Sequence, residues 1–144
     1  MLDTIRQAWG WTGLEPAEVV ATNPFGNLIV RATSGAVWRI CPEEWSCAVI
    51  ARDADEFATL STDDEFRIDW EMSRLVEIAR QQLGPVPDGE CYCLKHPAVI
   101  GGPYEAANFG TITLSELIWF SGYMALQIKD VPDGGEVIIE IVRK

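Results

Sequence analysis

Two cysteines and the only histidine of the chain lie close together in the stretch CYCLKH, residues 91–96. Cys91, Cys93 and His96 have the spacing C-x-C-x2-H, and thiolates with imidazole are preferred ligands of zinc. The stretch alternates like a β-strand, in which Cys91 and Cys93 would share a face about 7 Å apart. Zinc knuckles instead converge their thiolates on a C-x2-C turn. His96 would face away from Cys93, so activation of that thiol needs a bend. The pattern favours neither a metal site nor an enzyme.

A glycine-rich segment follows, HPAVIGGPYEAANFGTI, residues 96–112. It lacks both G-x-x-x-x-G-K-[ST] and G-x-G-x-x-G, the usual phosphate-binding patterns. We expect a rigid strand-to-helix connection in which Gly101 and Gly102 allow close backbone approach. The alternative is a binding site, for which Tyr104 and Asn108 are the candidate residues.

The charge of the chain is strongly negative, with 22 acids, 11 bases and a net charge of −11. Such a surface repels phosphate backbones and argues against direct nucleic-acid binding. Ten acids lie between residues 43 and 71, opposed only by Arg52 and Arg67. We predict that this segment attracts a basic partner, although helix caps and a solvated surface would explain the same acids. The predicted partner-binding residues are Glu43, Glu44, Trp45, Asp63, Asp64, Glu65, Tyr104 and Asn108.

Aromatic residues could anchor such a partner, because interface energy concentrates in tryptophan, tyrosine and arginine. Trp45, Trp70 and Tyr104 are the candidates, and core packing is the alternative for each tryptophan.

Length and composition indicate one soluble domain of 144 residues, with no apolar run long enough to span a membrane. The N-terminal segment lacks the features of a secretory signal, so we expect a cytoplasmic protein. Its four cysteines, at positions 41, 47, 91 and 93, are expected to be reduced thiols.

The expected elements begin with a helix over residues 2–9 and an irregular segment up to residue 24. A β-hairpin follows over 27–33 and 36–42, with a third strand over 46–52. After it, Asp53 with Glu56 and Thr62 with Glu65 fit capping boxes. The second box opens a continuous helix over 63–83, whose predicted buried stripe is Ile68, Met72, Leu75, Val76, Ala79 and Leu83.

Gly84 and Pro85 should end that helix. A strand over 90–96, a helix over 114–129 capped by Thr113, and a strand over 136–142 complete the expected order. The fold class is therefore α+β: a single domain with a largely antiparallel sheet packed against two main helices.

Several segments carry a resemblance to a known family: FGNLIV (25–30), VWRICPEEWSCAVIA (37–51), DWEMSRLVEIA (69–79), CYCLKHPAVIGGPYEAANFGTITLSEL (91–117) and QIKDVPDGGEV (127–137). Together they resemble the C-terminal domain of type VI secretion immunity proteins, which is often joined to a GAD-like domain. The motif positions of that family correspond here to Lys95, Pro97, Gly101, Gly102, Tyr104, Asn108, Gln127, Asp130, Pro132 and Gly134. Residues 1–24 are too few for a GAD-like domain, so we expect a lead-in over 1–24 and the immunity-protein-like domain over 25–144.

The resemblance implies a non-enzymatic cytoplasmic protein that binds a DNase effector and needs no cofactor. A basic nuclease would be the partner, in keeping with the acidity of this chain. The alternative is a regulatory module that binds a small molecule or peptide through its GGPY loop. Neither of these two hypotheses defines the oligomeric state of the free protein.

Overall fold

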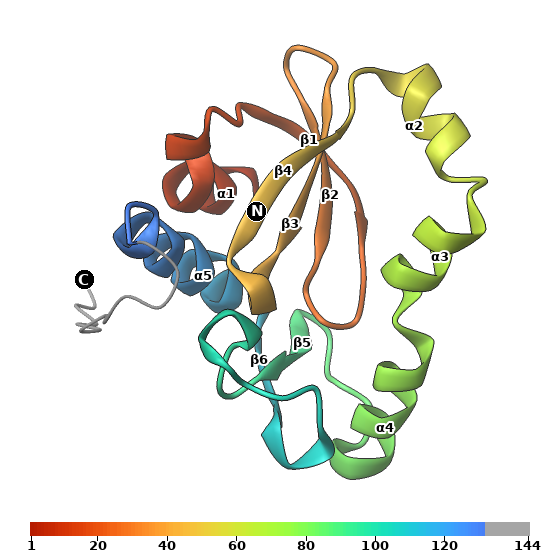
Figure 1. The fold of residues 1–144 in the computed structure, drawn as a ribbon, viewed down its shortest axis with the longest axis vertical. Coiled ribbons are helices and arrows are strands. Elements are labelled where there is room, and N and C mark those ends of the chain that lie inside the picture. The colour runs from red at the N-terminus through yellow and green to blue at the C-terminus, as the bar shows by residue number, and fades with distance from the viewer. Residues whose placement is uncertain (132–144) are drawn as a thin grey trace.

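The computed structural model describes residues 1–131, and its centre is a four-stranded antiparallel sheet (Figure 1). The strands β1 (Pro16–Thr22), β2 (Leu28–Ala32), β3 (Val37–Cys41) and β4 (Ser46–Ala51) follow one another in space as they do in the chain. The predicted hairpin and third strand are confirmed. β-Branched side chains alternate across the sheet there, so both faces have apolar groups to bury.

The strand β1 corrects the expectation that the segment up to residue 24 is irregular. Pro16 is the first residue of this strand, and within residues 1–131 the strand pairs with β2 alone. Proline is tolerated at the first residue of a strand and in edge strands, because the backbone N–H that it lacks is not needed there to pair with a neighbouring strand.

One face of the sheet is covered by α1 (Leu2–Trp9) and α5 (Leu114–Ile128), which lie together in Figure 1. Ile5 and Ile118 are fully buried there, in one cluster with residues of β2 and β3. The two helices approach closely at Gly122, where a Cβ atom would come within 2.4 Å of the Ala8 carbonyl oxygen. Residues 1–24 thus contribute to the same core as the rest of the chain.

The opposite face is covered by α2 (Ala54–Leu60) and α3 (Asp64–Glu71) (Figure 1). Phe57, Phe66 and Trp70 of these helices pack against a cluster of buried sheet residues, Ile29, Val37 and Ala51. The sheet is therefore the middle of three layers.

The predicted continuous helix over 63–83 is wrong, because the chain breaks into α3 and α4 (Ser73–Leu83) at Met72. Met72 has a left-handed backbone, with φ of 47°. The side-chain amide of Asn23 donates to the Trp70 carbonyl oxygen at 2.9 Å and so satisfies a group released at the break.

The break also changes which face of the segment is buried. Val76 and Ala79 are buried, but Ile68 is 72% exposed and Leu83 41% exposed. The cap of α3 is Asp63 rather than Thr62, because the Asp63 carboxylate accepts from the Phe66 N–H at 3.0 Å.

A second, two-stranded antiparallel sheet is formed by β5 (Glu90–Leu94) and β6 (Phe109–Thr113). Phe25, Tyr92 and Phe109 pack there with Val76 and Ala79 of α4. The strand over 90–96 is confirmed, whereas β6 was missed inside the glycine-rich segment. The helix caps at Asp53 and Thr113 are confirmed, since each side chain accepts an N–H three residues on.

The strand expected over 136–142 lies outside the described residues. Within residues 1–131, no helix combines the length and apolar character that crossing a bilayer requires.

Candidate functional site

A cleft of about 520 Å³ lies beside the sheet, where β3 and β4 face the junction of α3 and α4. Its lining includes acidic, apolar and hydroxyl-bearing side chains: Arg39, Cys41, Glu43, Glu44, Ser46, Ala48, Ile50, Ile68, Asp69, Met72, Leu75 and Tyr104. The cleft thus gathers residues from the sheet, two helices and the loop between β5 and β6.

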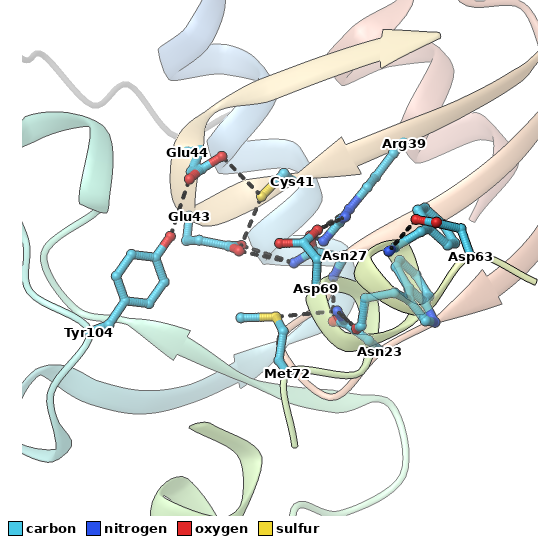
Figure 2. Close-up of polar contacts among 12 residues, drawn as sticks. Asn23, Asn27, Arg39, Cys41, Glu43, Glu44, Asp63, Asp69, Met72 and Tyr104 are labelled. Atoms are coloured by element: carbon cyan, nitrogen blue, oxygen red, sulfur yellow. Dashed lines mark hydrogen bonds and ion pairs between the residues drawn. The ribbon is translucent and has the colours of Figure 1, made fainter. Parts of the chain in front are cut away.

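Asn27 holds the inner side of this site, and it is fully buried. Its side-chain N–H donates to both carboxylate oxygens of Glu43, at 3.0 and 3.3 Å. Its side-chain oxygen accepts from Arg39, at 3.2 Å from Nε and 2.9 Å from Nη2. Figure 2 shows Asn27 between these two charged groups, so a single amide orients an acid and a base.

Glu43 is only 7% exposed, although it is a carboxylic acid. The short 3-10 helix over residues 42–44 places it between β3 and β4. The Cys41 thiol also donates to it, at 3.1 Å. Burial raises the pKa of Glu43 despite its hydrogen bonds, because desolvation disfavours the charged form.

Arg39 connects the sheet to α3. Its guanidinium forms an ion pair with Asp69 and lies over the Trp70 ring, 5.3 Å from the centroid. A guanidinium can make both contacts because it is planar and stacks on aromatic faces. The contacts orient α3 against the acidic cleft.

Tyr104 reaches the outer rim of the cleft from the glycine-rich loop. Its hydroxyl donates to a carboxylate oxygen of Glu44 at 3.4 Å, and 38% of its surface is exposed (Figure 2). The pKa of Tyr104 is raised, first by burial and then by the negative charges of Glu43 and Glu44. The phenol therefore remains a hydrogen-bond donor at neutral pH.

The glycine-rich loop is held by contacts within itself. The Asn108 amide accepts from the His96 N–H and donates to the carbonyl oxygens of His96 and Pro103, each at 2.9 Å. A Cβ atom on Gly102 would lie 1.6 Å from the His96 carbonyl oxygen. Asn108 and Gly102 therefore serve the loop's shape, but the loop joins β5 to β6 and is not the strand-to-helix connection that the sequence predicted.

The acidic surface continues from the cleft along α2 and α3. Glu65 is exposed, whereas Asp64 pairs with Arg67 at 3.2 Å and Asp63 caps α3. Arg52 pairs with Glu56 at 2.8 Å. Arg52 and Arg67, the two arginines between residues 43 and 71, are thus each paired with an acid of the same segment.

Two of the predicted contact residues lie in the interior. Trp45 is 7% exposed and belongs to the main core cluster, so the expectation of an exposed anchor is wrong for this residue. Glu43 is also buried, and it lines the cleft from inside. Glu44, Asp63, Asp64 and Tyr104 are exposed, and Trp70 is half-buried.

Sequence reasoning missed Asn27, Arg39 and Cys41. The available signal was a polar residue beside or within an otherwise apolar strand segment, which is too common to single out a site. Asn27 precedes β2, and Arg39 alternates with apolar neighbours in β3. Only the pairing of Ile29 with Arg39 and of Leu28 with Ile40 places them near each other.

The four cysteines are free thiols. Burial raises the pKa of Cys47 to about 11 and that of Cys91 to about 12, and it also raises the pKa of Cys93. The His96 ring nitrogen lies 3.0 Å from the Ile100 carbonyl oxygen. In the part of the chain that the structure describes, no three histidine, cysteine or acidic side chains gather to hold a metal ion.

A second cavity, of about 490 Å³, lies on the other side of Glu43. Its walls are mainly apolar and include Trp45, Pro97, Ile100 and Phe120. Glu43 lines both cavities and therefore lies between them.

The comparisons with known proteins agree with this mixed fold. The crystal structure of Atu4351 from Agrobacterium tumefaciens superposes with a TM-score of 0.54 at 12% sequence identity, covering 84% of this chain and 62% of that one. This chain therefore spans less than two thirds of the length of that protein, and the likeness concerns the fold alone. No curated protein matches the chain.

Family membership is carried by the sequence from β4 to α5. Residues 51–125 match the family described as T6SS immunity protein Tdi1, C-terminal, where T6SS denotes the type VI secretion system. The chain belongs to this family, which confirms the resemblance seen in its sequence. The description of the family is that of a type VI secretion immunity protein.

Proposed function

We propose that this protein is a cytoplasmic immunity protein that binds a DNase toxin and blocks it by covering the toxin's basic active face. The observation that carries the proposal is the family match over residues 51–125, which includes the acidic helices α2 and α3. Inhibition of this kind is steric and electrostatic and needs no catalytic group or cofactor.

Charge complementarity supports a nuclease as the partner. A DNase must be basic where it holds the phosphate backbone. The net charge of −11 favours rapid association with such a surface, and the exposed acids of α3 concentrate part of that charge at one face. The same charge opposes a direct contact between this protein and DNA.

We further propose that the immunity domain extends beyond the matched segment on its N-terminal side. The helix α1 packs on α5 and β1 pairs with β2, so removal of either would expose the core that supports the matched residues.

The test uses the toxin encoded beside this gene. Glu65→Lys should slow association by about threefold to tenfold at low salt and lose that effect near 1 M salt, because surface charges act mainly on encounter. Asp88→Lys is the matched control, since it reverses an exposed acid outside α2 and α3. Asp63 is unsuitable because its replacement would also remove the cap of α3.

Nuclease activity and survival of cells expressing the toxin provide the functional readouts. The proposal requires a complex on gel filtration, loss of DNA cleavage in that complex, and protected cells. Unimpeded cleavage at saturating immunity protein would refute inhibition, and equal association rates for Glu65→Lys and Asp88→Lys would refute the placement on α3.

The apolar cavity beside the glycine-rich loop favours a second candidate, a module that binds a small molecule or peptide. Lys95 and His96 supply polar groups at its edge. A ligand that raises the melting temperature of the wild-type protein but not of Ile100→Ala, a change in the cavity wall, would support this candidate.

A further inference from the structure

The cleft beside β3 and β4 holds more negative charge than its own bases neutralise. Arg39 is the basic residue of its lining, and this guanidinium is paired with Asp69. Among the ion pairs of residues 1–131, none includes Glu43 or Glu44. A carboxylate as deeply buried as Glu43 is costly without a cation paired with it. A cationic group that entered the cleft would offset that cost.

We propose that the cleft receives one long basic side chain, of arginine or lysine, from the toxin, an inference that rests on the proposed function. The carboxylates of Glu43 and Glu44 bind its charged head. Asn27 donates to Glu43 from the protein interior and so holds that carboxylate in place for the incoming cation (Figure 2).

The walls of the cleft suit the stem of such a side chain. Ile50, Ile68, Met72 and Leu75 line it, and the 72% exposure of Ile68 leaves apolar surface uncovered. Arginine and lysine bury their methylene groups along apolar surface while their charged heads bond elsewhere. A volume of about 520 Å³ accommodates one such side chain with water.

Tyr104 completes the site at its rim. Its hydrogen bond to Glu44 is long, at 3.4 Å, and can be exchanged for a shorter charge-assisted bond from the incoming cation. Its ring also offers an aromatic face for a cation. This gives a partner-binding role to a residue of the family motif, whereas Asn108 of the same loop is engaged by backbone groups.

The first experiment needs no toxin. The ¹⁵N-labelled full chain is titrated with Nα-acetyl-arginine methylamide, and with the citrulline analogue as a neutral control of the same shape. The arginine derivative should shift the amide signals of Ser46, Ala48, Met72 and Tyr104. It should bind at least about fivefold more tightly than the citrulline derivative, equivalent to roughly 1 kcal/mol.

Variants make this titration specific to the cleft. Glu44→Gln should weaken arginine binding by at least about threefold, since it removes one of two carboxylates that carry a charge-assisted bond. Glu65→Gln, on α3 but outside the cleft lining, should leave binding unchanged. Equal binding of citrulline, or shifts scattered along α2 and α3, would overturn the assignment.

The second experiment measures dissociation of the complex with the toxin encoded by the neighbouring gene. Glu43→Gln and Glu44→Gln should each speed dissociation by about tenfold or more, because loss of a buried charge partner acts on dissociation. A stable complex whose dissociation is unchanged in both variants would overturn the cleft assignment and leave the proposed function standing. Absence of any complex between the wild-type protein and the toxin would overturn the proposed function. The arginine titration would then show independently whether the cleft binds a basic side chain.

Discussion

Replacement of Asn27 by alanine should destabilise the protein strongly, because this amide supports two charged groups at once. It bonds the Glu43 carboxylate and the Arg39 guanidinium, and it is fully buried. Hydrogen bonds to charged groups contribute about 1.5–3 kcal/mol each. We therefore expect Asn27→Ala to lower the free energy of unfolding by about 3–5 kcal/mol, close to the cost of breaking a buried pair.

The loss should depend on pH, and the sign follows from Glu43. Its pKa in the folded protein is raised, and the bond from Asn27 lowers it. A carboxyl with a raised folded pKa loses stability as pH rises from its ordinary value through the folded one. Without Asn27 the pKa rises further, so Asn27→Ala should lose more stability at pH 8 than at pH 5.5.

The neighbours of Glu43 do not obscure this dependence. Cys41, Cys91 and Tyr104 all have raised pKa values and stay neutral over that range. Glu44 and Asp69 are the remaining acids of the cleft lining, and both are present in the two proteins being compared.

Urea unfolding followed by tryptophan fluorescence measures both effects. A loss of this size corresponds to a fall in melting temperature of roughly 6–20 °C for a chain of this length. Asn108→Ala is the matched control and should show no such pH dependence, because within residues 1–131 the Asn108 amide bonds only backbone atoms. A loss below about 1 kcal/mol, or an equal loss at both pH values, would refute the reasoning.

Two further variants test the cleft and the loop. Glu43→Gln should gain stability relative to the wild-type protein as pH rises above the ordinary pKa of a glutamate, because the variant has no proton to lose. Urea unfolding measured across pH would contradict this if the difference in unfolding free energy between the two proteins stayed constant. Gly102→Ala should cost about 3 kcal/mol or more, since its Cβ would meet the His96 backbone, whereas Gly101→Ala has open space and pays only the roughly 1–2 kcal/mol of its left-handed backbone. Similar melting temperatures for these two alanine variants would contradict the close approach at Gly102.

Local chemistry determined much of this structure. Alternation of β-branched residues predicted β2, β3 and β4, and the acceptor side chains of Asp53 and Thr113 predicted two helix starts. These features depend on residues within a few positions of one another, so a single sequence carries them. The family could also be recognised from sequence, through the motifs of the segment from β4 to α5.

The candidate site was predictable only in part. The acidic character of residues 43–71 was visible, as were Glu44 and Tyr104 as contact candidates. Their meeting was not, because they are sixty positions apart and join only across the cleft.

Tertiary structure alone decided the features on which the site depends. The helical periodicity of the sequence continues through Met72, but the chain breaks there. Asn23, which is far away in sequence, donates a hydrogen bond to the Trp70 carbonyl oxygen at the break. Composition placed Glu43 on the surface, yet the fold buries it and supplies Asn27 as its donor. Burial and long-range hydrogen bonds depend on which elements meet in space, and local patterns of sequence do not contain that information.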